Sequence, residues 1–305
     1  MKINFTPFGL IEKSTTELNS NVPVALISLT DQGNRRAILA GRGIPLDWVN
    51  NYWLGHDYRG MDRSEFYALA DVTGLEARHG RPLRAGEIGC AQSHKAASQQ
   101  MLQFSCDLLL VLEDDVIPES SHVLEQVALL AERLLPHARS GAAFVCLLGA
   151  PEQQADGALK RRVVSPRRKP DLCPDLFLHI DPVKTLWRAH AYFISKEAAQ
   201  RALTLEPKIL TLADDWCERR RLGVIDEILY CRPIVFRQDE VADSTIRPRD
   251  HGENHKPKKF DGTLTTRLLR SVSNGTFMRQ ARASILFRIR NIAFRFQSLF
   301  PYYLR

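Results

Sequence analysis

The chain lacks several features that would place it quickly in a class of protein. None of its 305 residues belongs to an apolar run as long as the roughly 18 residues that a membrane-spanning helix needs. Residues 1–21 contain neither a sustained apolar run nor a small-residue cleavage site, so we expect no signal peptide. The six cysteines form no CxxC pair, which argues against a zinc knuckle or a dithiol redox centre. These absences favour a protein of the reducing cytoplasm with free thiols.

Basic charge is concentrated at one end of the chain. The formal net charge is +7, but the segment from Lys256 to Arg305 carries about +10, because it holds eleven lysines or arginines and one acid. Apolar residues on one helical face between Met278 and Leu299 are flanked by arginines. This pattern is typical of a helix that lies on an anionic membrane surface, and a helix packed on the domain is the alternative. No nucleic-acid-binding signature accompanies the charge, so we expect no nucleic-acid partner.

Strand-like and helix-like segments alternate over most of the chain. The apolar, strand-like segments are 22–30, 107–115, 141–149, 190–195 and 226–236. The helix-like segments are 32–41, 86–103, 120–135 and 196–203, with a short helix and a turn at 61–80. Residues 45–60 and 150–175 are expected to be loops. The alternation predicts an α/β fold with a mostly parallel central sheet flanked by helices.

Three adjacent carboxylates, Glu113, Asp114 and Asp115, follow the apolar run 108–112. In an open α/β sheet, ligands bind at the carboxyl ends of the strands. Neighbouring acids repel one another, and a divalent cation at the strand end would neutralise them. Mg²⁺ and Mn²⁺ prefer such oxygen ligands and commonly bridge to phosphates. A solvated junction between strand and loop is the alternative that the spacing leaves open.

A second motif lies about twenty residues before these acids. The segment GEIGCAQSH at 86–94, followed by LEDD at 112–115, resembles the signature of glycosyltransferase family 25. That family includes bacterial lipooligosaccharide galactosyltransferases and collagen galactosyltransferases. Further segments resemble the family in the same order, namely ISLTDQGNRR, HAYFISKEAAQRAL, ADDWCERR and FRQDEVADSTI. Arg188 and Ala189 stand where the family has Gly-Thr, and residues 45–60 lack its Asp-Ala, departures that bear on the donor sugar and the acceptor.

The resemblance implies a GT-A-like catalytic domain over residues 1–250, followed by a basic helical tail at 251–305. It implies an inverting, metal-dependent transfer of a sugar, galactose from UDP-galactose, onto a saccharide of lipopolysaccharide or a related surface glycan. The enzyme would work in the cytoplasm, bound to the anionic inner membrane through its tail. Asp115 would bind Mn²⁺ or Mg²⁺ directly, and Glu113 would bind the metal, the donor ribose or a metal-bound water.

The resemblance also suggests which residues contact the substrates. Asp214 and Asp215 would supply the base that deprotonates the acceptor hydroxyl, and their alternative role is to cap the helix that follows. The residues expected to contact the nucleotide sugar are Arg35, Arg36, Glu87, Ser93, His94, Glu113, Asp114, His190 and Tyr192. Since His190 and Tyr192 alternate along a strand, we expect one of them to face the cleft. The residues expected at the acceptor side are Gln238, Ser244 and Thr245, and the candidates for a late metal ligand are His251 and His255.

Two other functions share parts of this pattern. A nucleotidyltransferase would use the same acids and the same metal, but would transfer a nucleotide. A non-catalytic protein that binds membranes or nucleic acid would carry the acids as ordinary surface groups. Slow hydrolysis of a nucleotide sugar without acceptor distinguishes a sugar transferase from such a binding protein.

Overall fold

The computed structural model describes residues 4–7, 21–104, 106–149, 167–168, 172–173, 175–179 and 188–239. The predicted tail at 251–305 lies outside the described residues, and so do Ser244, Thr245, His251 and His255. Among the residues that are described, no helix is both long and apolar enough to cross a membrane.

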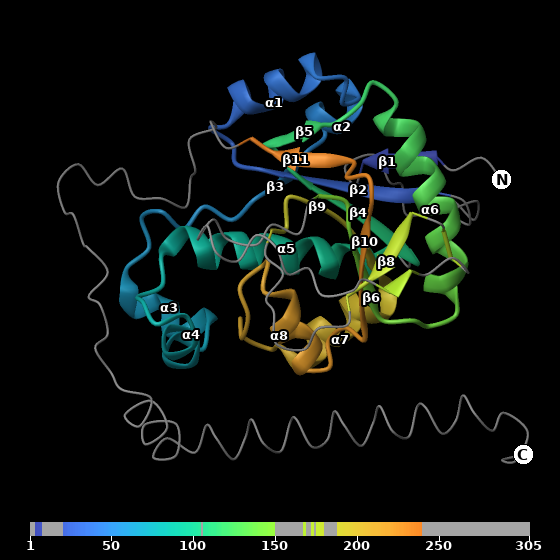
Figure 1. Ribbon diagram of the computed structural model, residues 1–305. Helices are drawn as coiled ribbons and strands as arrows, with labels where there is room; N and C mark the ends of the chain where they lie inside the picture. The colour runs from blue at the N-terminus through green and yellow to red at the C-terminus, as the bar shows by residue number, and fades with distance from the viewer. Residues whose placement is uncertain are drawn as a thin grey trace, which may run out of the picture. The chain divides into compact units, whose positions relative to one another are not determined.

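A nine-stranded sheet runs through the described part of the chain, in the order β1-β2-β4-β9-β6-β10-β8-β7, with β3 also paired to β2 (Figure 1). Its strands are β1 (Asn4–Pro7), β2 (Asn21–Ser28), β3 (Trp53–Leu54), β4 (Leu108–Glu113), β6 (Phe144–Leu147), β7 (Arg167–Arg168), β8 (Leu176–Leu178), β9 (Ala191–Ser195) and β10 (Glu227–Cys231). A separate pair is formed by β5 (Val116–Pro118) and β11 (Phe236–Gln238). The strands expected from the sequence are therefore present.

The direction of the strands departs from the expected, mostly parallel sheet. β1, β3 and β4 run parallel to β2, and β10 runs parallel to β6. β9, however, lies antiparallel between β4 and β6, and β8 lies antiparallel to β10. The sheet is thus mixed. One consequence is that the residues before β9 lie at the same edge as the carboxyl end of β4, where the Glu113 amide donates to the His190 carbonyl at 2.8 Å.

Helices cover both faces of this sheet (Figure 1). The described helices are α1 (Gly33–Gly41), α2 (Leu46–Asn50), α3 (Arg63–Leu69), α4 (Val72–His79), α5 (Ala85–Gln103), α6 (Val123–Arg139), α7 (Lys196–Leu205) and α8 (Trp216–Arg221), of which α3 and α4 pack against α5 in a separate cluster. The four longer predicted helices are confirmed. The prediction of a loop at 45–60 is wrong for α2 and β3, and 61–80 forms two helices. In α2, burial of Trp48 and Val49 outweighs the loop-like composition of the segment.

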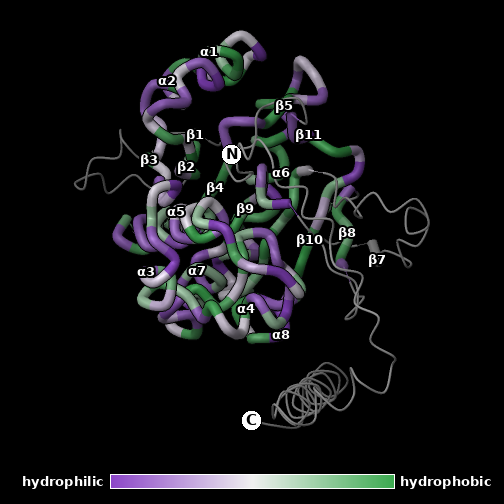
Figure 2. The backbone as a smooth tube through the Cα atoms, turned by 90° about the vertical axis from the view of Figure 1, so that its left-hand side faces the viewer, coloured by the Kyte–Doolittle hydropathy of each residue, from purple (hydrophilic) through white to green (hydrophobic). Residues whose placement is uncertain are grey.

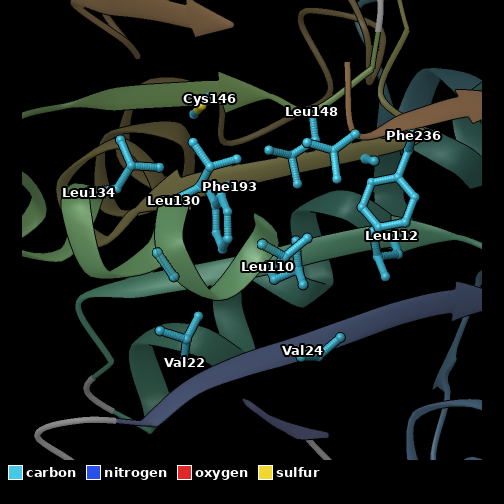
Figure 3. Packing of buried hydrophobic residues seen from close by; sticks show 14 of the residues in the cluster. Val22, Val24, Leu110, Leu112, Leu130, Leu134, Cys146, Leu148, Phe193 and Phe236 are labelled. Carbon is cyan, nitrogen blue, oxygen red and sulfur yellow. The ribbon is translucent and has the colours of Figure 1, made fainter. Parts of the chain in front are cut away.

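Strand β4 is buried on both faces, which explains its continuous apolar sequence. Leu110 and Leu112 belong to a cluster that includes residues of α1, α2 and α6, and Figure 3 shows Leu110 near Phe193 of β9 and Leu112 near Phe236. Leu109 and Val111 belong to a second cluster, which includes residues of α5, α7 and α8. Figure 2 accordingly shows mainly hydrophobic residues along the central strands. A polar side chain on β4 can therefore reach a pocket or solvent only at the end of the strand.

All six cysteines are free thiols, as the sequence predicts. Five of them are buried, and Cys90 is partly exposed. The five buried thiols fit the core, because a free cysteine packs as a small apolar side chain.

Helix α6 offers a matched test of this packing. Leu134 is 0% exposed within the core cluster, whereas Leu129 on the same helix is 50% exposed. We expect Leu134→Ala to lower the free energy of unfolding by about 2–5 kcal/mol, because it removes buried methyl groups and leaves a cavity. Leu129→Ala should change it by no more than about 0.5 kcal/mol. Chemical denaturation of both variants measures the difference, and equal losses would contradict this packing.

Candidate functional site

The three carboxylates at the end of β4 lie in a pocket at the edge of the sheet. The residues that line it are Ile27, Ser28, Leu29, Gln32, Arg35, Gly55, His56, Asp57, Tyr58, Arg59, Gly86, Cys90, Ser93, His94, Glu113, Asp114, Asp115 and Gln238. They come from the ends of β2 and β4, from α1 and α5, and from β11. We call this the first pocket. It lies where the sequence predicts a ligand site, at the carboxyl ends of parallel strands.

A guanidinium of the chain neutralises part of this acidic cluster. Arg35 on α1 lies 3.1 Å from an oxygen of Asp114 and 3.1 Å from an oxygen of Asp115. The Ser28 hydroxyl donates to the other Asp114 oxygen at 2.6 Å. Burial nevertheless raises the pKa of Asp114 to about 6, against the opposing effects of Arg35 and Ser28. Asp114 is thus tied to β2 and α1, and both of its oxygens are engaged.

Asp115 differs from its neighbour because one of its oxygens has no partner. Its Oδ2 forms the ion pair with Arg35 and accepts a hydrogen bond from the Gln238 amide at 3.0 Å. Its Oδ1 is buried and has no hydrogen-bond partner among the described residues. A buried, unpaired carboxylate oxygen is costly, and a cation or a ligand hydroxyl would satisfy it. The residues present therefore fit a divalent cation held by Asp115, with Glu113 close by.

Glu113 is linked to two buried side chains. Its Oε1 lies 3.0 Å from His94 Nε2, and His94 Nδ1 lies 2.7 Å from the Tyr192 hydroxyl. Burial raises the pKa of Glu113 well above its ordinary value, and the charges of Asp115 and Asp214 raise it further. Burial also lowers the pKa of His94 to about 3, so this imidazole is neutral at physiological pH.

The two adjacent arginines of α1 have different positions. Arg35 lines the first pocket, as described above. Arg36 donates to the Ser28 hydroxyl at 2.7 Å and to the Leu29 carbonyl at 2.6 Å, and its guanidinium lies 3.8 Å from the centre of the Tyr52 ring. Arg36 therefore holds the end of β2 in place, and it is not among the residues that line the pocket.

A side chain of α5 itself caps the amino-terminal end of this helix. Glu87 accepts from the Arg84 amide at 2.9 Å and forms an ion pair with Arg81. This carboxylate satisfies a free amide at the helix end, which is a common form of helix capping. Ser93 accepts from the His56 amide at 2.7 Å and donates to the Gly89 carbonyl at 2.7 Å. Both residues thus have local structural contacts in addition to their place near the pocket.

The loop 55–59 also lines the first pocket, and the sequence analysis did not identify it. Ser93 holds this loop against α5, and a Cβ at Gly89 would lie 2.5 Å from the His56 carbonyl oxygen. Gly89 is therefore needed for the close approach of loop and helix. His56 Nδ1 is buried and has no hydrogen-bond partner within the described residues. The sequence of residues 55–59 has no motif or apolar pattern that would have indicated that this loop lines the pocket.

A second pocket adjoins the first. Its lining residues are Glu87, Cys90, Glu113, Arg188, Ala189, Leu212, Ala213, Asp214 and Gln238. Three residues line both pockets, namely Cys90, Glu113 and Gln238. Glu113 thus lies between the two, with Asp115 in the first pocket and Asp214 in the second.

The carboxylates of Asp214 and Asp215 have distinct environments. Asp215 accepts from the Glu218 amide at 3.3 Å and caps α8, and Arg78 lies 3.9 Å from it. Asp214 accepts from the Arg188 amide at 3.3 Å and lines the second pocket. Burial raises the pKa of Asp214 above its ordinary value. The capping role that the sequence left open therefore applies to Asp215.

The expectation that His190 or Tyr192 would face the cleft is wrong: Tyr192 lies on β9, which is buried on both faces, and His190, just before that strand, is only 2% exposed. Both side chains are buried, and neither lines either pocket. A Cβ at Gly149 would lie 2.1 Å from His190 Nε2, so only glycine fits beside that ring. Trp216 is also buried, and its indole donates to the Arg188 carbonyl at 3.0 Å.

Comparison with known proteins supports the resemblance over part of the chain. A search of curated proteins found no match. Residues 22–134, however, match the family model of glycosyltransferase family 25 (LPS biosynthesis protein). This range contains Arg35, α5 and the three acids, while Asp214 lies beyond it. Over residues 22–134 the chain is therefore similar to glycosyltransferase family 25.

Proposed function

We propose that this chain is an inverting glycosyltransferase that uses a nucleotide-sugar donor and a divalent cation. The observation that carries the proposal is the arrangement of two adjoining pockets with Glu113 between them. The first contains the unpaired oxygen of Asp115, and the second contains the partly buried carboxyl of Asp214. A transferase needs two such groups close together, because one holds the cation on the donor diphosphate and the other activates the acceptor hydroxyl.

In this proposal the first pocket binds the donor. Asp115 and Glu113 would hold Mn²⁺ or Mg²⁺, as their oxygen donors favour. The cation, when bound, supplies positive charge that stabilises the departing nucleoside diphosphate. Arg35 lies against Asp114 and Asp115, so its guanidinium is available to the diphosphate beside the cation. Asp114 keeps Arg35 there through the ion pair described above.

The second pocket binds the acceptor saccharide in this proposal. An inverting transfer forms the new bond from the face opposite the leaving group, and a base removes the proton of the attacking hydroxyl. Asp214 is the residue that we assign to this role. Its raised pKa makes it a stronger base than an exposed aspartate, and the Arg188 amide fixes its orientation.

The family match supports lipopolysaccharide or a related surface glycan as the acceptor class. We propose UDP-galactose as the donor, because the sequence resembles the galactosyltransferases of this family. The basic tail would bring the enzyme to the anionic inner membrane, where a lipid-linked acceptor is found.

The role of Asp115 can be tested by donor binding. We expect Asp115→Asn to weaken the Mn²⁺-dependent affinity for UDP-galactose about 100-fold or more, because loss of even an outer-shell partner costs about 10–100-fold. Calorimetric titration with and without Mn²⁺ measures this. Asp226→Asn is the control, because Asp226 is 58% exposed and pairs with Arg201 on the surface. Affinity of Asp115→Asn equal to that of the control would exclude the metal role.

The assignment of the base can be tested with two neighbouring variants. Asp214→Asn should retain donor binding but lose about 10²-fold or more in transfer rate, the usual scale for loss of a general base. Asp215→Asn should retain transfer, since asparagine also caps helices. Transfer assays with saturating donor compare the two. A larger loss in Asp215→Asn than in Asp214→Asn would reverse the assignment.

The pH dependence of transfer provides a further test. The base must be ionised to accept a proton, so the rate should rise with pH through the pKa of Asp214. Because burial raises this pKa, the rise should lie above the pH range in which an exposed aspartate titrates. The pH profile of kcat/KM measures it, and the residual rate of Asp214→Asn should lack this rise. An unchanged profile in that variant would contradict the role.

A further inference from the structure

Two residues of α5 and one of β4 bring three different metal-binding groups together. Cys90 and His94 lie four positions apart, so they share one face of the helix. Glu113 ends the adjacent strand. One ligand atom from each residue, the sulfur, a ring nitrogen and a carboxylate oxygen, lies within 4.8 Å of the other two. The catalytic proposal above uses neither the Cys90 thiol nor the His94 imidazole.

We propose that Cys90, His94 and Glu113 form a binding site for a thiophilic divalent cation, Zn²⁺. A thiolate, an imidazole and a carboxylate are all zinc ligands, and sulfur disfavours Mg²⁺ and Mn²⁺. Three protein ligands leave the fourth position of a tetrahedral ion open. All three residues line the first pocket, and Cys90 and Glu113 also line the second, so an ion can enter and the open position faces solvent or substrate.

The spacing suits such an ion with little rearrangement. Zinc bonds of roughly 2.0–2.3 Å hold neighbouring ligand atoms about 3.3–3.6 Å apart in a tetrahedron. His94 Nε2 and Glu113 Oε1 lie 3.0 Å apart, and the upper limit for all pairs is 4.8 Å. Small side-chain rotations therefore reach the required geometry. The ion would replace the contact between His94 and Glu113.

Tyr192 supports the proposed zinc ligand His94 through a hydrogen bond to its other ring nitrogen. Its hydroxyl lies 2.7 Å from His94 Nδ1 and can accept a hydrogen bond from the Nδ1–H group, which leaves the lone pair of Nε2 directed toward Glu113. A hydrogen bond to the second ring nitrogen is the usual support of a metal-binding histidine. Tyr192 is itself fixed, because it is buried and its ring packs edge-on against Trp216.

The electrostatic field at this position favours a cation. Asp115 lines the first pocket and Asp214 lines the second, on either side of Glu113. A bound divalent ion would be attracted by the same two carboxylates. Its binding would release the protons of the thiol and the carboxyl, as thiolate and carboxylate coordination requires.

The proposed zinc site differs in its ligands from the proposed site of the donor cation, which uses only carboxylate oxygens, including those of Asp115. The two share Glu113, so an ion on Cys90 and His94 would withdraw this carboxylate from the donor pocket. If the proposed function holds, Zn²⁺ should therefore inhibit transfer in competition with the donor. Binding of the ion itself does not depend on that function.

Titration of the full-length protein with Co²⁺ tests the site directly. Thiolate coordination to Co²⁺ gives a near-ultraviolet charge-transfer absorption, which Zn²⁺ should abolish by displacement and Mg²⁺ should not. Cys90→Ala should lose this absorption. Cys231→Ala is the matched control, because Cys231 is buried near Cys146 and Cys173, and it should keep the absorption.

Tyr192→Phe adds a graded test, since loss of an outer-shell hydrogen bond should weaken Co²⁺ affinity about 10–100-fold. Circular dichroism of each variant verifies that the fold is retained. Absence of the absorption in the native protein would overturn the proposal. Its persistence in Cys90→Ala, or its loss in Cys231→Ala with Cys90 intact, would overturn it as well.

Discussion

Strand β4 is enclosed by apolar side chains on both faces, and its three terminal carboxylates must therefore be compensated at the edge of the sheet. The chain does this in three different ways. Asp114 is held by Arg35 and Ser28, Asp115 by Arg35 and Gln238, and Glu113 contacts the neutral His94. Of the three, only Asp115 retains a buried oxygen that has no partner among the described residues, and this is what makes the cluster suited to a ligand.

The mixed direction of the sheet places a second group of residues at the same edge. Because β9 is antiparallel to β4, the segment that precedes it returns to the carboxyl end of β4, and Arg188 is brought close to Asp214. Residues from β11 arrive there too, where Gln238 binds Asp115. Glu113 consequently lies between two pockets, and the proposed transfer assigns one of them to each substrate.

Helix α5 supports this region with small and polar residues. Gly89 permits the close approach of the loop 55–59, and Ser93 holds that loop by its backbone. His94 contacts Glu113 from the same helix, while Cys90 lines both pockets. Because so many positions of the motif GEIGCAQSH make these contacts, it contains few large apolar residues for a helix that packs against a sheet.

The sequence alone determined the alternation of strands and helices, the burial of β4 and the position of the acidic cluster, because these depend on local apolar patterns. It also carried a resemblance to glycosyltransferase family 25, and a model of that family matches residues 22–134. It did not determine the direction of β9 or the helix α2, whose stability depends on distant packing partners. Nor did it separate the roles of adjacent residues. Arg35 and Arg36, or Asp214 and Asp215, have the same chemistry in the sequence, and only the tertiary contacts of each side chain decide which one faces a pocket and which one holds the fold.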